Sequence, residues 1–128
     1  MVISGSDWDE LVAHARDDAP NECCGYGRVR DGRVEEVFRA ENIRHSPYGY
    51  EIDSNSLFKT YTLEDDGFDV MVYHSHPKSA AEPSQTDINL ANYPHWRYVI
   101  VSLAGEPTVR CWRVSDGKVE EEDVTVER

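Results

Sequence analysis

The sequence predicts a single α/β domain in which a mixed β-sheet is covered by helices. Helical and strand-like periodicities follow one another along the chain as helix, hairpin, helix, strand, helix and three strands. The 128 residues suffice for one hydrophobic core and contain no linker, internal repeat or low-complexity segment. We therefore expect one domain over residues 1–128.

The N-terminal half begins with a helix. Ser6 and Asp9 resemble a capping box, apolar residues then recur at helical spacing, and Pro20 marks a stop. The turn residues Asp31 and Gly32 separate two strand-like runs and indicate a hairpin. The elements expected after the first helix are strands over 24–29 and 33–40, a loop over 42–50, a short strand over 50–53 and a helix from 54 to about 64.

The C-terminal half is built around a dense apolar run, Phe68–Tyr73, which is typical of a strand and leads directly into His74-Ser75-His76. We expect a loop over Lys78–Pro83 because this stretch has no periodicity. The remaining elements expected are a short helix from near Ser84 to Tyr93 and strands over 97–103, 108–114 and 118–126.

The composition excludes several classes of protein. The net charge is −12, from 25 acidic and 13 basic residues, whereas a nucleic-acid-binding protein needs a basic face. No apolar run approaches the ~20 residues that span a bilayer, and the acidic start lacks the basic region of a secretory signal. The three cysteines form no Cys-x-x-Cys pair and suit a reducing compartment. We expect a soluble, cytoplasmic protein.

Residues with metal-binding side chains gather between His74 and Asp87. Two histidines at i and i+2 on a strand point to the same face, so His74 and His76 can converge near the strand end. A catalytic zinc takes three protein ligands and one water, and these histidines with Asp87 supply such a set. From spacing alone, two surface histidines and an unrelated first-turn aspartate are an equal alternative.

The same stretch resembles the signature of the JAMM (MPN-domain) metallopeptidases, which reads His-x-His, seven residues, Ser, two residues, Asp. The signature is complete here as His74, His76, Ser84 and Asp87. Upstream, the segment Pro20-Asn21-Glu22-Cys23-Cys24-Gly25 is similar to the family's Pro-x-Glu-x-Cys-Gly. The resemblance covers nearly the whole chain. It has one departure, because only Tyr26 stands before Gly27 where the family usually has three apolar residues.

This resemblance implies a three-layer α/β/α sandwich with a mixed sheet, of the cytidine-deaminase-like type, and hydrolysis of an amide bond. It implies Zn²⁺ held by His74, His76 and Asp87, with Glu22 taking a proton from the attacking water and passing it to the leaving amine. It also implies that Ser84 donates a hydrogen bond to the developing oxyanion. Residue chemistry alone does not separate Glu22 from the other glutamates that we weighed, which are Glu36, Glu41, Glu51 and Glu82.

For small stand-alone relatives, the resemblance implies ubiquitin-like β-grasp proteins as substrates, cut at their C-terminal tails. We place deconjugation from a target lysine slightly ahead of the alternative, release of a cysteine from a sulfur-carrier protein. The segment Tyr50, Glu51, Ile52 and Asp53 is expected near the tail. Ser75 is a further candidate contact, although it faces the other side of its strand and a local hydrogen bond is its simpler role.

Two rival functions and several other residues are weighed against this interpretation. A non-catalytic MPN scaffold usually lacks one or more ligands, and a zinc deaminase needs His-x-Glu and Pro-Cys-x-x-Cys, which are absent. His14, His45 and His95 match no ligand position and are expected at the surface or at an interface. The oligomeric state is not predicted.

Overall fold

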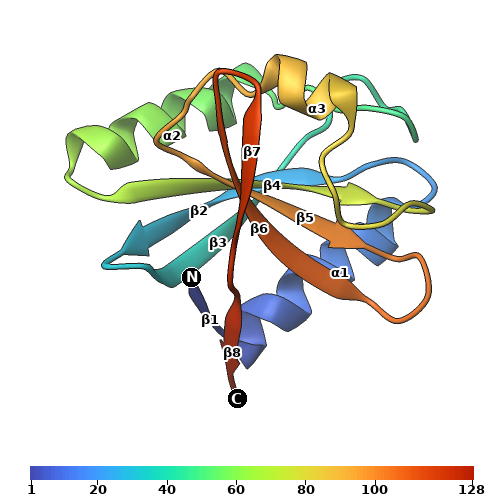
Figure 1. Ribbon diagram of the computed structural model, residues 1–128, viewed down its shortest axis with the longest axis horizontal. Coiled ribbons are helices and arrows are strands. Elements are labelled where there is room, and N and C mark those ends of the chain that lie inside the picture. Colours follow the sequence, from blue (N-terminus) through green and yellow to red (C-terminus); the bar gives the residue numbers. More distant parts are fainter.

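The computed structural model describes residues 1–128 and contains one eight-stranded mixed sheet with three helices (Figure 1). Helix α1 (Gly5–Asp18) lies on one side of the sheet, and α2 (Ser54–Asp65) and α3 (Gln85–Leu90) lie on the other. The predicted three-layer α/β/α sandwich is thus confirmed. The strands are β1 (Val2–Ser4), β2 (Cys24–Arg30), β3 (Arg33–Ala40), β4 (Asp69–His76), β5 (Arg97–Ser102), β6 (Thr108–Ser115), β7 (Lys118–Glu122) and β8 (Thr125–Glu127).

Strand β4 occupies the middle of the sheet. The strand order is β7-β6-β5-β4-β2-β3-β1-β8, so β4 is hydrogen-bonded along both edges. It runs antiparallel to β2 and parallel to β5, with His74 opposite Cys24 on one side and Ile100 on the other. A strand that is paired on both edges and buried on both faces holds its side chains in fixed positions.

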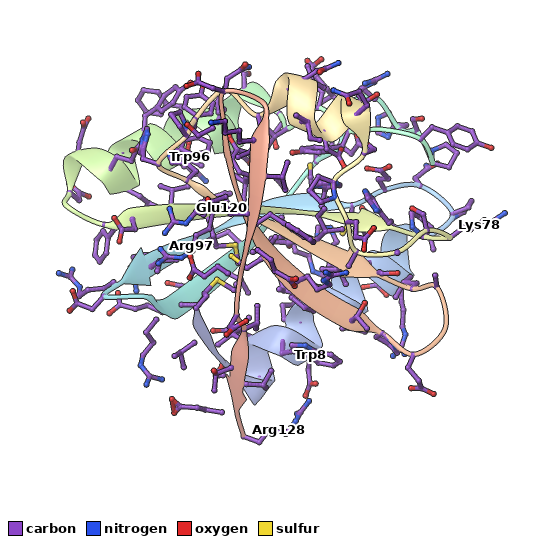
Figure 2. The ribbon with its side chains drawn as sticks, viewed as in Figure 1. Trp8, Lys78, Trp96, Arg97, Glu120 and Arg128 are labelled. Carbon is purple, nitrogen blue, oxygen red and sulfur yellow. The ribbon has the colours of Figure 1, made fainter.

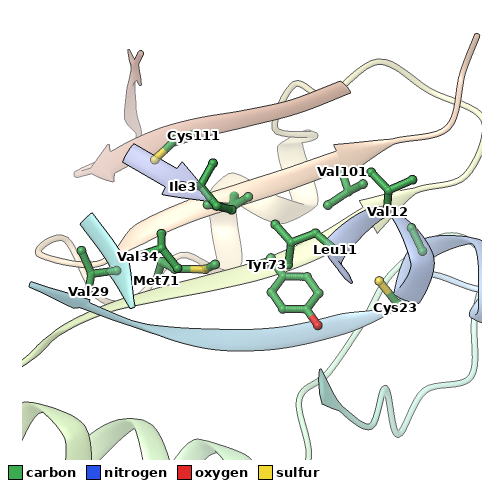
Figure 3. Packing of buried hydrophobic residues seen from close by; sticks show 12 residues of the cluster. Ile3, Leu11, Val12, Cys23, Val29, Val34, Met71, Tyr73, Val101 and Cys111 are labelled. Atoms are coloured by element: carbon green, nitrogen blue, oxygen red, sulfur yellow. The ribbon is translucent and has the colours of Figure 1, made fainter. Parts of the chain in front are cut away.

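The two faces of β4 belong to two separate cores. Met71 and Tyr73 point toward α1 and pack with Leu11 and Val12 (Figure 3). The alternate positions, among them Val72, face the side covered by α2 and α3. Side chains alternate along a strand with a period of two, so the histidines that follow at positions 74 and 76 continue the α2 and α3 side.

The glycines of β2 make room for the large side chains of β4. A Cβ added to Gly25 would lie 2.4 Å from the ring of Tyr73, and one added to Gly27 would lie 2.9 Å from Met71. Both distances are shorter than a real carbon contact. A side chain at Gly25 would also meet the Phe38 carbonyl oxygen at 2.4 Å and does not fit, whereas one at Gly27 would require the flexible end of Met71 to shift. The short run Gly25-Tyr26-Gly27, where the sequence departs from the family pattern, keeps its pairing with β4.

The single strand predicted over 118–126 is wrong. β7 pairs with β6, whereas β8 pairs in parallel with β1 at the other end of the strand order. Only Asp123 and Val124 connect β7 to β8, so the sheet curls until its two outer edges approach (Figure 1). Neither residue is glycine or proline, and one aspartate within an acidic run is too weak a turn signal to predict the break.

Three smaller expectations also need correction. The first helix is capped by Ser4, whose Oγ accepts from Asp7 N–H at 3.0 Å, because β1 leads into the helix without a loop. Helix α3 ends at Leu90 because the Tyr93 N–H donates to the hydroxyl of Tyr98 instead. The segment 50–53 forms one isolated bridge, from Ile52 to Asn42, and no strand. None of the three helices has the length and apolar character needed to cross a membrane.

Glu122, on the outer strand β7, forms ion pairs with three cations, one of which is the N-terminus at the opposite edge of the sheet. Its carboxylate lies 2.9 Å from the Met1 ammonium, 2.9 Å from Arg97 Nε and 3.0 Å from Arg113 Nε (Arg97 is labelled in Figure 2). Partial burial alone would raise the pKa of Glu122, but these three cations outweigh burial and hold the pKa at about 2. This depressed pKa stabilises the fold above the ordinary glutamate value and loses that effect as the pH falls toward 2.

Replacing Glu122 with glutamine should therefore lower the free energy of unfolding by about 1–2 kcal/mol at pH 7, after a discount for solvent screening. The loss should be less than half as large at pH 3, where the wild-type protein has already lost much of this stabilisation. Urea unfolding at both pH values measures the difference. Glu120→Gln, on an exposed glutamate of the same strand, is the matched control. An equal loss at both pH values would contradict an ionic role for Glu122.

Candidate metal centre and catalytic site

The two histidines of the motif end β4 on the side of the sheet that carries α2 and α3. His74 and His76 are buried, with 3% and 5% of their surfaces exposed. Between them, Ser75 points to the opposite side. The Nε2 atoms of the two histidines converge to 3.2 Å. The alternation predicted from the sequence therefore brings both rings to one point, from a strand that has little freedom to move.

Asp87 reaches the histidines because a capping box holds it at the start of α3. The Ser84 Oγ accepts from Asp87 N–H at 3.0 Å, and Asp87 Oδ2 accepts from Ser84 N–H at 2.9 Å. The same Oδ2 lies 3.1 Å from the Nε2 atoms of both His74 and His76. The Ser-x-x-Asp spacing of the motif is therefore the spacing of a helix cap, and the cap orients the carboxylate toward the histidines.

The three converging atoms suit a divalent metal ion. His74 Nε2, His76 Nε2 and Asp87 Oδ2 form a nearly equilateral triangle with sides of 3.1–3.2 Å. Tetrahedral zinc with bonds of about 2.0–2.1 Å would separate its ligand atoms by roughly 3.3 Å, which is close to these sides. These residues form the one cluster of His, Cys, Asp and Glu ligand atoms close enough to share a metal. Two nitrogens and one carboxylate oxygen are also a ligand set that zinc accepts.

The protonation of His74 and Asp87 agrees with this use. Burial lowers the pKa of His74, which favours the neutral imidazole that binds metals. For His76 burial acts in the same direction, but hydrogen bonds to Asp87 and Ala80 outweigh it and raise the pKa. Burial alone would raise the pKa of Asp87, yet the hydrogen bonds to the two histidines lower it strongly, so Asp87 is a carboxylate.

Each histidine ring is also oriented by a contact with a residue outside the triangle. His76 Nδ1 lies 2.8 Å from the carbonyl oxygen of Ala80, which fixes the proton on Nδ1 and leaves Nε2 as a lone-pair donor. The ring of Tyr50 stacks on His74 with centroids 4.4 Å apart and planes at 20°. Tyr50 was predicted as a substrate contact, and the structure gives it this supporting role as well.

Removing the Tyr50 ring should loosen the site. Tyr50→Ala is expected to weaken zinc binding by about 10–100-fold, the usual cost of losing a group that orients a ligand. Tyr50→Phe keeps the stacked ring and should bind zinc as the wild type does. Competition with a chromophoric chelator measures both affinities. Equal zinc affinity for the alanine and phenylalanine variants would show that the ring does not position His74.

Glu22 lies beside the triangle because of the register between β2 and β4. The pairing of Cys24 with His74 continues through a hydrogen bond from Ser75 N–H to the Cys23 carbonyl, which brings Glu22 opposite His76. Glu22 is 6% exposed, and its Oε1 is buried without a hydrogen-bond partner. Burial raises the pKa of Glu22 to about 7. The other glutamates that the sequence offered are all exposed: Glu36, Glu41, Glu51 and Glu82.

Ser84 is exposed at the N-terminus of α3. Its Oγ accepts a hydrogen bond from Asp87, but no group of the protein takes the hydroxyl proton. Ser84 can therefore still donate to a ligand that reaches the site. Its position as the cap places this donor one helical turn from the carboxylate of Asp87.

Two cavities lie beside the triangle, and they differ in the residues that line them. One has a volume of about 270 Å³ and is lined by Glu22, His76 and Lys78, among others. The second, of about 350 Å³, is mostly apolar and includes Tyr50, whose ring stacks on His74. A substrate bound across the triangle would thus meet the cavity that includes Tyr50 on the His74 side and the cavity that contains Glu22 and Lys78 on the His76 side.

The residues predicted near the substrate differ in where their side chains lie. Glu51 and Ile52 line the apolar cavity together with Tyr50. Asp53 caps α2, since its two carboxylate oxygens accept from the backbone N–H groups of Glu41 and Ser56 at 3.0 Å each. These two bonds explain the position of Asp53 without a substrate, and its contact with the tail stays a prediction.

Ser75 has the simpler of its two expected roles, whereas His14 does not lie where it was expected. Ser75 is completely buried, and its Oγ accepts from Cys23 N–H at 2.8 Å, so it has the local role and lies out of reach of a substrate. His14 was expected at the surface but is buried, with its Nδ1 2.7 Å from the hydroxyl of Tyr73. The position of His14 on the apolar face of α1, one turn from Leu11, could have signalled this burial.

The chain is similar to known proteins over nearly its whole length. Residues 6–115 match the family described as prokaryotic homologs of the JAB domain. A CysO-cysteine peptidase from Mycobacterium tuberculosis is 39% identical, over 98% of this chain and 90% of the relative. A desampylase from Haloferax volcanii is 33% identical, over 81% of each chain. The crystal structure of a JAB1/MPN domain protein from Archaeoglobus fulgidus, 20% identical, covers 100% of both chains with a TM-score of 0.66.

Proposed function

Because the chain belongs to the family of prokaryotic homologs of the JAB domain, we propose that it is a zinc-dependent peptidase of the JAMM type. The convergence of His74 Nε2, His76 Nε2 and Asp87 Oδ2, with a buried unpaired glutamate beside them, is the observation that carries this proposal. We treat residues 1–128 as one domain, since a single sheet connects both cores.

The ligands would be His74, His76 and Asp87, and bound zinc would supply a water that is acidic enough to attack at neutral pH. Glu22 accepts the proton of the attacking water and delivers it to the leaving nitrogen as the C–N bond breaks. Ser84 donates its free hydroxyl proton to the carbonyl oxygen as negative charge develops there. Each role uses a group that the fold leaves available: a buried carboxylate oxygen and an unused hydroxyl proton.

The substrate in this proposal is the C-terminal tail of a ubiquitin-like β-grasp protein. The relatives named above include a CysO-cysteine peptidase and a desampylase, whose names correspond to release of a cysteine from a carrier and to deconjugation. The apolar cavity lined by Tyr50, Glu51 and Ile52 is suited to the tail itself. The enzyme would hydrolyse the amide bond after the tail, whether the leaving amine belongs to a conjugated lysine or to an added cysteine.

Intact-mass analysis of two substrates tests the proposal. One substrate is a β-grasp modifier isopeptide-linked to lysine, and the other is a β-grasp sulfur carrier with one cysteine added at its C-terminus. Zinc-loaded protein should cleave at least one of them, and a chelator should abolish the reaction. Zinc binding without cleavage of either substrate would instead favour a non-catalytic scaffold.

A further inference from the structure

The cavity of about 270 Å³ on the His76 side contains one cation that the proposed chemistry does not use. Lys78, in the loop after β4, lines this cavity together with Glu22 and His76. Figure 2 shows Lys78 extending from the outer end of that loop. Most arginines of the protein are paired with carboxylates, whereas Lys78 forms no ion pair. Its charge is therefore free for a ligand.

The position of Glu22 assigns this cavity to the leaving group. Whichever residue protonates the leaving nitrogen must lie within hydrogen-bond reach of it. Glu22 is absent from the lining of the apolar cavity, and it also lines a third cavity, of about 520 Å³, that contains no residue of the triangle. Only the cavity on the His76 side contains both Glu22 and a proposed ligand. The amine part of the substrate therefore belongs on the His76 side, and the modifier's tail on the side of Tyr50. This step rests on the proposed function.

The size and charge of the cavity restrict what the leaving group can be. Its volume is below the roughly 300–1,000 Å³ of pockets that take drug-sized ligands, so it suits one small residue. Glu22 would repel a carboxylate here when it is ionised, as would the net charge of −12. Lys78 is the only lysine or arginine in the lining and offsets that repulsion.

We propose that this cavity binds a single C-terminal amino acid and that Lys78 pairs with its free α-carboxylate. The preferred substrate is then a ubiquitin-like protein that ends one residue beyond the scissile bond. Water adds to the carbonyl carbon, the C–N bond breaks, and the proton goes to the nitrogen, so the amino acid leaves with its carboxylate intact. A lysine in an isopeptide bond presents no such carboxylate, because its own carboxyl group is part of the acceptor chain.

The test compares three substrates that share one β-grasp carrier. The first ends in an added cysteine with a free carboxylate, the second in the corresponding cysteine amide, and the third is isopeptide-linked to lysine. We expect kcat/KM for the acid to exceed that for the amide by about 10-fold, the size expected for one hydrogen-bonded charge pair. In Lys78→Gln this ratio should fall to about 1, and Lys78→Arg should restore most of it. Lys59→Gln, on an exposed lysine of α2, should keep the wild-type ratio.

A binding measurement separates failure of this inference from failure of the proposed function. Affinities of the acid and amide substrates for zinc-loaded Glu22→Gln, with and without Lys78→Gln, can be measured by fluorescence anisotropy. A preference for the acid that depends on Lys78 supports the inference even if the wild type cleaves nothing. Cleavage with a ratio that Lys78→Gln leaves unchanged, or a preference for the isopeptide, would overturn the inference and leave the peptidase proposal standing.

Discussion

Replacing Glu22 with glutamine should lower kcat by about 10²–10⁴-fold while zinc stays bound. The amide of glutamine keeps the size of the side chain but cannot accept the proton of the attacking water. Glu22 is not among the three atoms that converge as ligands, so zinc stoichiometry should be unchanged. Metal analysis of the purified variant and turnover of the cysteine-ended carrier measure the two effects.

Glu41→Gln is the matched control for this change. Glu41 is exposed, and the sequence had offered it as an alternative base. Its replacement should leave kcat and zinc content at wild-type values. Full activity in Glu22→Gln, or an equal loss in Glu41→Gln, would show that the proton is carried by another group.

Replacing Asp87 with alanine should abolish both zinc binding and turnover. The loss of zinc affinity should exceed the 10–100-fold that removal of an orienting group costs, because a ligand atom itself is lost. The change also removes half of the capping box of α3, so helix loss must be separated from ligand loss. Asp87→Asn serves this purpose, since its side-chain oxygen can still accept from the Ser84 N–H.

Circular dichroism and zinc titration of the two variants distinguish these effects. Asp87→Asn should keep the helix and still bind zinc poorly, because a neutral amide is a weak zinc ligand. Wild-type zinc affinity in Asp87→Asn would mean that Asp87 acts only as a helix cap, which is the alternative that the sequence left open.

Local patterns in the sequence predicted the part of the site that follows from strand and helix geometry. His74 and His76 share a face because strand side chains alternate, and the Ser84 to Asp87 spacing forms a capping box. The choice of Glu22 depended on the family resemblance. Its burial comes from the register between β2 and β4, a contact between segments about fifty residues apart that no local pattern encodes.

The features that the sequence missed depend on long-range pairing. β1 and β8 are three residues each and are stabilised by each other and by the neighbouring sheet, so neither carries a periodic signal of its own. The stacking of Tyr50 on His74 requires a loop to fold back over the sheet. The periodicity of the sequence does not predict the path of a loop. Ser4 is not recognisable as a cap from local patterns because it is also the last residue of β1.

The ligands proposed for zinc come from parts of the fold with unequal local stability. β4 is hydrogen-bonded on both edges and is buried over positions 70–76, whereas α3 has six residues and buries none of them completely. Chelation should therefore leave the sheet folded and accelerate amide hydrogen exchange mainly in α3. The protein would then differ from zinc fingers, which unfold without their metal. The metal-free form would stay folded, and only the segment that carries Asp87 would become more mobile. Such a form could bind zinc again without refolding.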